Sequence, residues 1–134
     1  MSRAAIPSVE PWLRSIMRIV IGFTFCCHGM MKLFGLFGGL GGHRAHLFSL
    51  MGLAGIIETF GGWLILLGLF TVPVAFILCG EMAFAYFTVH IHRGPVPIVN
   101  GGELAVVYCF VYLYLIAAGP GPLSLDRLIR GKYR

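Results

Sequence analysis

The stretch VPVAFILCGEMAFAYFTVH, residues 72–90, decides the fold class because it is almost entirely apolar and carries a single acidic residue, Glu81. A helix needs roughly 17–25 apolar residues to cross the hydrocarbon core of a bilayer, and this stretch has that length. We therefore predict a membrane-spanning helix here. The carboxylate of Glu81 then needs an explanation, because a charge is costly in hydrocarbon.

Three further apolar runs lie at residues 13–35, 50–69 and 103–118, the last of them slightly short for a membrane span. The composition agrees with a membrane protein: 58% of the residues are hydrophobic and 11% are charged, whereas soluble domains carry about 25% charged residues. We predict an all-α integral membrane protein, a bundle of four transmembrane helices that forms one domain over residues 1–134. No small-residue cleavage site follows the first run, so we expect this helix to be retained.

The net charge of +5 comes from basic residues that lie mostly near the two ends of the chain. This distribution is typical of an inner-membrane protein and does not favour nucleic-acid binding. Four spans place both termini on one side, with seven basic residues there and three on the other side. These are Arg3, Arg14, Arg18, Arg127, Arg130, Lys132 and Arg134, against Lys32, Arg44 and Arg93. The positive-inside rule therefore predicts cytoplasmic termini.

The segment that follows the fourth apolar run, residues 119–134, is predicted to be a basic cytoplasmic tail. Ser124 is placed to cap a short amphipathic turn in which Leu125, Leu128 and Ile129 share one face. The basic residues of this turn either lie against anionic lipid or belong to a solvated tail.

Several ionisable residues fall within the apolar runs, and a rise of ~1.5 Å per residue gives their depths. Glu58 lies about 12 Å and His28 about 10 Å below the outer surface, and Glu81 lies near the midplane. Lys32 is one turn from His28 on the same face. A charge at the membrane centre costs about 2.5–3.5 kcal/mol, so we predict that these side chains face one another or line a wet cavity. Either glutamate could instead be neutral, because burial disfavours a charged carboxylate. The outer rim holds His90 and Glu103.

Each of these residues also has a structural explanation. His28 and Glu58 could form a hydrogen bond that only fixes helix packing, and Lys32 could extend to the outer headgroups. Asn100 could be the N-cap of the fourth helix, with Glu103 three residues on as in a capping box. His90 could simply lie at the membrane interface.

Small residues flank Glu58 in the stretch AGIIETFGG, residues 54–62. They would let a second helix or a flat ligand come close, and close helix packing is the simpler explanation. The four cysteines lie in apolar runs, where cysteine behaves as a small hydrophobic residue: Cys26, Cys27, Cys79 and Cys109. Because no tight His/Cys spacing is present, the sequence predicts no metal site and only weakly favours haem.

Four motifs in order resemble the DoxX family of small bacterial membrane proteins: HGMMKLFG, AGIIETFGGWLILLGLFT, GEMAFAYFTVH and NGGELAVVYCFVYLYLIAAGPGPLSLD. The resemblance covers roughly residues 18–126. It implies a four-helix protein of the bacterial inner membrane that is linked to membrane redox chemistry: thiosulfate:quinone oxidoreductase subunits, resistance to quinones or oxidative stress, and thiol homeostasis. Seven residues occupy the motif positions and are the candidate site residues: His28, Lys32, Glu58, Glu81, His90, Asn100 and Glu103.

Two main functional hypotheses follow. In the first, the polar cluster binds a quinone-like or sulfur-linked redox partner near the outer leaflet, and the chain is an oxidoreductase subunit. His28 and Lys32 would donate to a quinone oxygen, and Glu58 or Glu81 would relay the proton. In the second, the chain is a non-enzymatic anchor or assembly subunit of a redox complex; a small lipophile carrier is a third option. The candidate partners are the lipid bilayer, a redox subunit that supplies electrons, and further copies of the chain.

Overall fold

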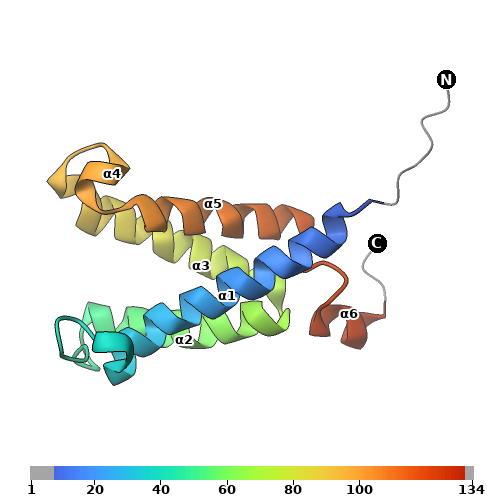
Figure 1. Ribbon diagram of the computed structural model, residues 1–134, viewed down its shortest axis with the longest axis horizontal. Coiled ribbons are helices and arrows are strands. Elements are labelled where there is room, and N and C mark those ends of the chain that lie inside the picture. Colours follow the sequence, from blue (N-terminus) through green and yellow to red (C-terminus); the bar gives the residue numbers. More distant parts are fainter. Residues whose placement is uncertain (1–7, 132–134) are drawn as a thin grey trace.

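Four apolar helices make up most of the computed structural model, which describes residues 8–131 (Figure 1). Three segments are long enough and apolar enough to cross a membrane: α1, Glu10–Phe34; α2, Leu50–Leu67; and α3, Thr71–Ala85, with the turns that continue it to Arg93. The fourth, α5, Glu103–Ala118, is shorter. All four predicted helices are therefore confirmed to within a few residues. That α5 also crosses the membrane stays a prediction.

Short elements connect these helices. They are the 3-10 turn Leu36–Gly38, the π-helical turn Tyr86–His90, the 3-10 turn Ile91–Arg93, α4 at Pro97–Asn100 and α6 at Leu125–Arg130. The third apolar run thus stays helical to its predicted end at residue 90. After α3, the chain continues as a wider π-helical turn and then as a narrower 3-10 turn.

Local sequence signals account for the ends of α1 and α2. Pro11 lies in the first turn of α1, where its missing N–H has no helical partner to lose. α1 is followed by Gly35 and α2 by Gly68, and both glycines adopt the left-handed conformation that ends a helix. The Ser49 hydroxyl accepts a hydrogen bond from the Gly52 N–H and so caps the start of α2.

The predicted cap at Asn100 is wrong. Asn100 is the last residue of α4, and the residue before α5 is Gly102, with no side-chain cap. The reason is that Gly101 turns left-handed (φ 73°) and separates α4 from α5. The Asn100 side chain instead accepts from the Gly102 N–H and donates to the Gly94 carbonyl, both at 2.8 Å. It therefore holds the α3–α5 connection together.

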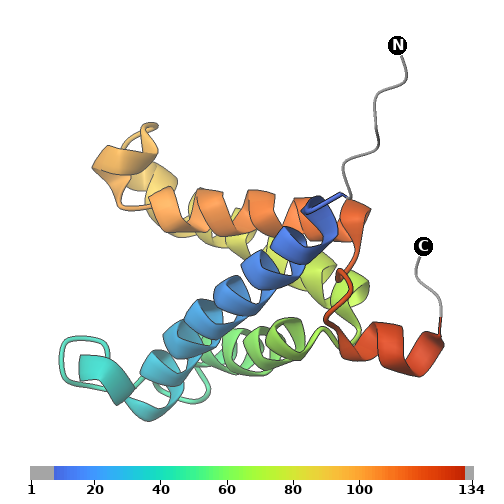
Figure 2. The same cartoon turned by 45° about the vertical axis from the view of Figure 1, so that its right-hand side comes forward.

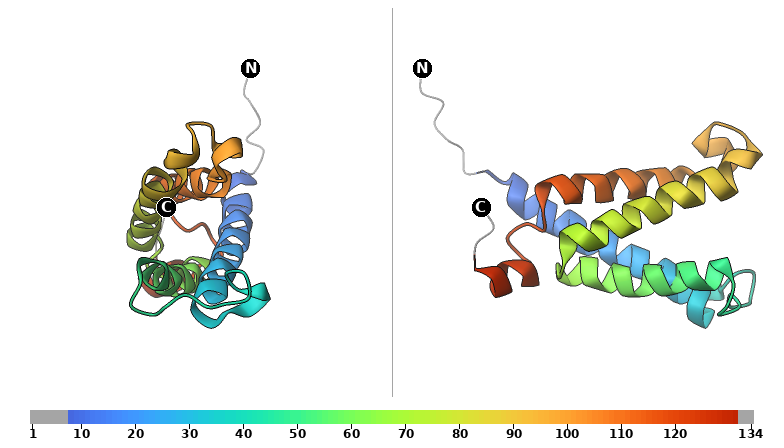
Figure 3. Two further views of the ribbon diagram at one scale, coloured as in Figure 1. Left: turned by 90° about the vertical axis from the view of Figure 1, so that its left-hand side faces the viewer. Right: turned by 180° about the vertical axis from the view of Figure 1, so that it is seen from behind.

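The helices form two antiparallel hairpins, α1 with α2 and α3 with α5, which are the most extensive helix pairings (Figure 3). The α1–α2 pairing is close: a Cβ on Gly22 would overlap the Leu66 backbone, and one on Gly62 would overlap the Cys26 backbone. The small residues near Glu58 thus serve packing within the chain, as the simpler explanation predicted.

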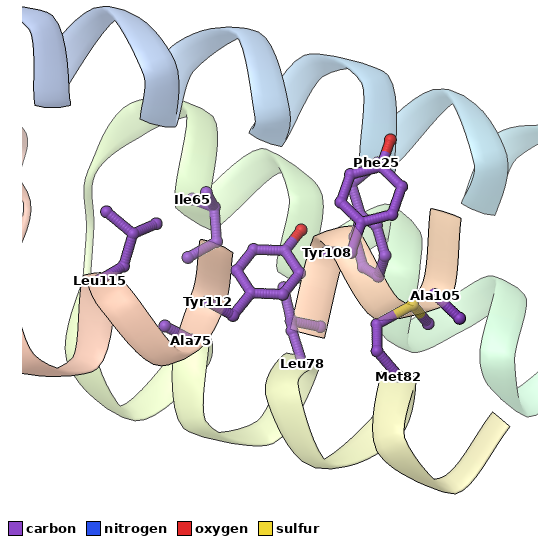
Figure 4. Close-up of a cluster of buried hydrophobic side chains, with 9 residues drawn as sticks. All are labelled: Phe25, Ile65, Ala75, Leu78, Met82, Ala105, Tyr108, Tyr112 and Leu115. Atoms are coloured by element: carbon purple, nitrogen blue, oxygen red, sulfur yellow. The ribbon is translucent and has the colours of Figure 1, made fainter. Parts of the chain in front are cut away.

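The two ends of the structure differ. The hairpins diverge toward the loop end, which we define by the α1–α2 connection and α4. They join at the terminal end, where α1 begins and α6 lies (Figure 2). The core between the hairpins is a cluster of buried side chains, most of them from α3 and α5 (Figure 4). Phe25 of α1 completes this core by packing edge-on against Tyr108 and Tyr112, with ring centroids 4.9 and 5.2 Å away.

Arg18 is fully buried and ties three segments together at the terminal end. Its guanidinium donates to the carbonyls of Ile65 and Leu66 in the last turn of α2, and to those of Pro120 and Leu123 before α6. Carbonyls in the last turn of a helix often lack helical partners. The Ile65 carbonyl also accepts from the Gly68 N–H, whereas for the carbonyls of Leu66, Pro120 and Leu123 the Arg18 guanidinium is the side-chain donor. We call this set of contacts the Arg18 lock.

α6 is joined to the rest of the protein beside the Arg18 lock. The Asp126 carboxylate accepts from the N–H groups of Phe70 and Thr71 at the start of α3, both at 2.8 Å. Ser124 caps α6 by accepting from the Arg127 N–H, as predicted. Leu128 and Ile129 are exposed on its surface, which agrees with an amphipathic turn.

Candidate functional site

An ion pair between α1 and α2 is the centre of the site. Lys32 Nζ lies 2.5 Å from Glu58 Oε1, and the two side chains are 17% and 3% exposed. Glycines bring these helices close enough for the pair: a Cβ on Gly29 would overlap the backbone of Glu58, and one on Gly55 would lie 3.1 Å from Lys32 Cβ. The prediction that Lys32 extends toward the headgroups is therefore wrong, because the carboxylate draws the ammonium inward.

Glu81 of α3 faces this pair from the other hairpin. Both of its carboxyl oxygens are buried, and neither has a hydrogen-bond partner among the described residues. Glu81 lies close enough to interact electrostatically with both Glu58 and Lys32. Lys32 and Glu58 therefore face one another as predicted, and Glu81 has unused hydrogen-bonding capacity among the described residues.

Two tyrosines of α5 complete the polar cluster. The Tyr108 hydroxyl donates to Thr24 Oγ1 of α1 at 2.9 Å. The Tyr112 hydroxyl is buried without a partner among the described residues. Their rings are nearly parallel with centroids 6.1 Å apart, and Figure 4 shows both side chains on the same side of α5, beside Phe25. The cluster therefore combines an ion pair, an unpartnered carboxyl group, an unpartnered phenol and flat aromatic surfaces.

His28 lies at the edge of the cluster. Its ring is half-buried and stands perpendicular to that of Tyr108, with centroids 6.1 Å apart. It is near enough to Glu58 for electrostatic interaction. In the described structure, however, the side-chain hydrogen bond to Glu58 comes from Lys32, not from His28. Lys32 lies one turn further along the same face of α1, and its longer side chain extends to the Glu58 carboxylate. We define the polar cluster as His28, Lys32, Glu58, Glu81, Tyr108 and Tyr112.

The other three predicted site residues lie toward the loop end. His90 Nδ1 is 3.3 Å from the Asn100 carbonyl oxygen, and Asn100 is buried within the α3–α5 connection. The Asn100 amide also donates to the Tyr86 hydroxyl at 3.2 Å. Glu103 is exposed in the first turn of α5. The structure therefore brings together four of the seven candidates and places these three apart from them.

Sequence reasoning missed three residues that matter here. Tyr108 and Tyr112 are four residues apart, which puts them on one helical face, and that spacing was the available signal. Arg18 was counted only as a flanking charge, although it shares a face with Phe25 and Lys32 at seven-residue intervals. A basic residue on the face that is buried further along α1 signals an internal role.

Comparison with known proteins identifies the family. The family model described as DoxX matches residues 13–91. A protein of Haemophilus influenzae, described as an uncharacterized protein, is 41% identical over 121 residues, which cover 87% of this chain and 90% of the relative. No solved structure matches the chain. Because the family model covers more than half of the sequence and the helices are apolar, the chain belongs to the DoxX family of multi-pass membrane proteins.

Proposed function

We propose that this protein is a membrane redox subunit whose polar cluster binds a quinone-like carrier and exchanges protons with it. The observation that carries the proposal is the Glu81 carboxyl group, whose two oxygens are buried without a hydrogen-bond partner among residues 8–131. Buried polar groups are almost always hydrogen-bonded. A carboxyl group left without a partner beside a charged pair is therefore a candidate for a ligand or a mobile proton.

The residues present suit a quinone head group. A quinone supplies a two-electron acceptor whose two carbonyl oxygens take up protons on reduction. Lys32, His28 and the Tyr112 hydroxyl can donate hydrogen bonds to such an oxygen. Glu81 would hold and release the proton, because its oxygens have no hydrogen-bond partner in the part of the chain that the structure describes. Glu58 keeps the Lys32 ammonium in place, and the rings of Phe25 and the two tyrosines offer flat apolar contacts. A sulfur-linked substrate would use the same donors.

Electrons would come from a partner subunit. Many large apolar side chains are exposed along the four helices, which suits contact with lipid and with such a subunit. We propose that α1, α2, α3 and α5 all cross the bacterial inner membrane and that residues 1–134 act as one domain, since the Arg18 lock and Asp126 tie α6 to the helices.

The proposed orientation places the terminal end in the cytoplasm. Arg18 and Lys32 are engaged inside the protein, and Arg3, Lys132 and Arg134 lie outside the described residues. The other basic residues among those described are Arg14, which pairs with Glu10, Arg127 and Arg130 at the terminal end, against Arg44 and Arg93 at the loop end. Among the described residues, basic charge still favours the terminal end, but by a smaller margin. Most of the predicted charge asymmetry therefore comes from the basic residues outside the described range.

A reporter pair tests this orientation. Fusions after Arg134 and within the glycine-rich α1–α2 connection should report opposite sides, with the C-terminus cytoplasmic, because basic flanks are retained inside. Alkaline phosphatase and green fluorescent protein fusions at each position provide the readout. A C-terminal fusion with phosphatase activity would reverse the assignment.

Glu81→Gln tests the proposed function itself. The amide resembles the carboxyl group in size but does not exchange a proton near neutral pH. We expect the variant to accumulate normally in the membrane and to fail to restore growth of a deletion strain under a redox-cycling quinone. Glu103→Gln, which alters an exposed carboxylate, is the matched control and should restore growth. His28→Gln should show a smaller defect, because His28 lies at the edge of the cluster.

The scaffold hypothesis predicts a different outcome. If the cluster only fixes helix packing, Glu81→Gln restores growth fully at equal membrane levels. That result would remove the proton-exchange role and leave an anchoring or assembly function. To distinguish the redox hypothesis from the scaffold hypothesis, the membrane levels of all variants are measured in the same cells as growth.

A further inference from the structure

Cys79 of α3 and Cys109 of α5 lie side by side outside the polar cluster. Their sulfur atoms are 3.7 Å apart, and Cys109 Sγ also lies 3.5 Å from the Cys79 carbonyl oxygen. Both residues are free thiols. A disulfide has an S–S distance of about 2.05 Å, so the two sulfurs, now 3.7 Å apart, must approach by about 1.7 Å. The two helices already pack against each other, so the sulfurs come from neighbouring positions on adjacent helices.

The two cysteines also match in depth. Cys79 follows the start of α3 at Thr71, and Cys109 precedes the end of α5 at Ala118, in helices that run antiparallel. At a rise of ~1.5 Å per residue, they lie about 12 and 13.5 Å from the terminal end. Both are only half-buried at the edge of the core. In the proposed membrane arrangement, thiols at this depth are accessible to an oxidant that is soluble in lipid.

We propose that Cys79 and Cys109 form a redox-active dithiol that a lipid-soluble quinone oxidises to a disulfide between α3 and α5. Both S–H bonds break and one S–S bond forms. The two electrons and two protons that the thiols lose pass to the quinone, which leaves as the quinol. The disulfide would join the two helices of the second hairpin close to Glu81 and Tyr108. This inference goes beyond the proposed function and does not depend on proton exchange at Glu81.

The other two cysteines are natural controls. Cys26 and Cys27 are adjacent on α1, where neighbouring residues point in different directions. The Cys26 thiol donates to the Phe23 carbonyl of its own helix. In the described structure, the contact between two sulfurs from different helices is that of Cys79 with Cys109. Oxidation should therefore distinguish one pair from the other.

The test uses the full chain in lipid nanodiscs, fully reduced and then freed of reductant. Decylubiquinone is the oxidant, because its fully substituted ring does not add thiols. After denaturation, a maleimide labels the remaining thiols, and intact mass gives their number. We expect labelling to fall from four thiols to two, with one quinol formed per disulfide. Cys79→Ser and Cys109→Ser should each abolish the disulfide, whereas Cys26→Ser and Cys27→Ser should retain it.

Several outcomes would overturn the proposal. One is that all four thiols of the unaltered chain stay reactive after quinone treatment. Another is a disulfide that peptide mapping assigns to Cys26 or Cys27. A third is that copper–phenanthroline forms the Cys79–Cys109 disulfide while the quinone does not. That result would mean that the two thiols are close enough to pair but that a quinone does not oxidise them. The proposed function is tested by growth of the Glu81→Gln strain, and this inference by thiol labelling of the unaltered chain and its cysteine variants, so failure of one remains distinguishable from failure of the other.

Discussion

Replacement of Arg18 by alanine should destabilise the protein by at least about 3 kcal/mol, because three carbonyls lose their side-chain donor and each buried carbonyl left without a partner costs about 1–3 kcal/mol. The guanidinium donates to four carbonyls, two at the end of α2 and two before α6. Of these, the Ile65 carbonyl keeps a second donor, the Gly68 N–H, so the loss falls on the other three. Arg18→Lys should recover only part of the loss, since one ammonium cannot reproduce the planar fork of donors. Unfolding of the purified variants in mixed detergent micelles, followed by circular dichroism, measures the effect.

Arg127→Ala is the matched control. Arg127 is a basic residue at the same end of the protein, but its side chain is exposed. It should unfold like the unaltered chain. An Arg18→Ala variant that is as stable as Arg127→Ala would mean that water or lipid satisfies the four carbonyls, and that the Arg18 lock does not hold α2, α6 and their connection together.

Breaking the Lys32–Glu58 pair on one side should be more harmful than removing both partners. Glu58→Leu leaves an ammonium in an apolar interior, and loss of one partner of a buried ion pair costs about 3–5 kcal/mol. Lys32→Met combined with Glu58→Leu removes both charges and should recover most of this free energy. The same unfolding measurement on the two single variants and the double variant gives the coupling free energy directly.

The expected signature is strong non-additivity. If the free-energy losses of the two single variants simply add, the residues do not form a desolvated pair, and the site must be rebuilt around Glu81 alone. Growth under a redox-cycling quinone should be lost in all three variants. The double variant thereby separates folding from function, because we expect it to be stable and yet inactive.

The helices could be predicted because an apolar run long enough to cross a bilayer forms few structures other than a helix. Residues 103–118 matched α5 at both ends, since a glycine precedes the run and another follows it. Ser124 was identified as a cap because serine followed by a short amphipathic turn is a local signal. The cap predicted at Asn100 was wrong because no local signal identifies it. Whether Asn100 begins one helix or ends another depends on the left-handed conformation of Gly101, which the sequence does not reveal.

The sequence predicted how far along their helices the site residues lie, but it did not predict which side chains contact one another. Helical rise gave the positions of Glu58 and Glu81 along their helices, and the carboxyl oxygens of Glu81 are buried as expected. Rotation of the helices and side-chain reach decided that Lys32 contacts Glu58 in preference to His28. Contacts between helices far apart in sequence, such as Tyr108 with Thr24 or Cys79 with Cys109, leave no local pattern. Arg18 was overlooked because positive charges near a helix start usually signal topology.

The central claim is that the buried carboxyl group of Glu81 exchanges a proton when a quinone bound nearby changes its redox state. Infrared difference spectroscopy of the protein in nanodiscs, recorded as decylubiquinone is reduced electrochemically, measures this exchange directly. We predict a carboxyl C=O band in the difference spectrum that disappears in Glu81→Gln and persists in Glu103→Gln. A spectrum without such a band, or a band that Glu81→Gln retains, would contradict the account.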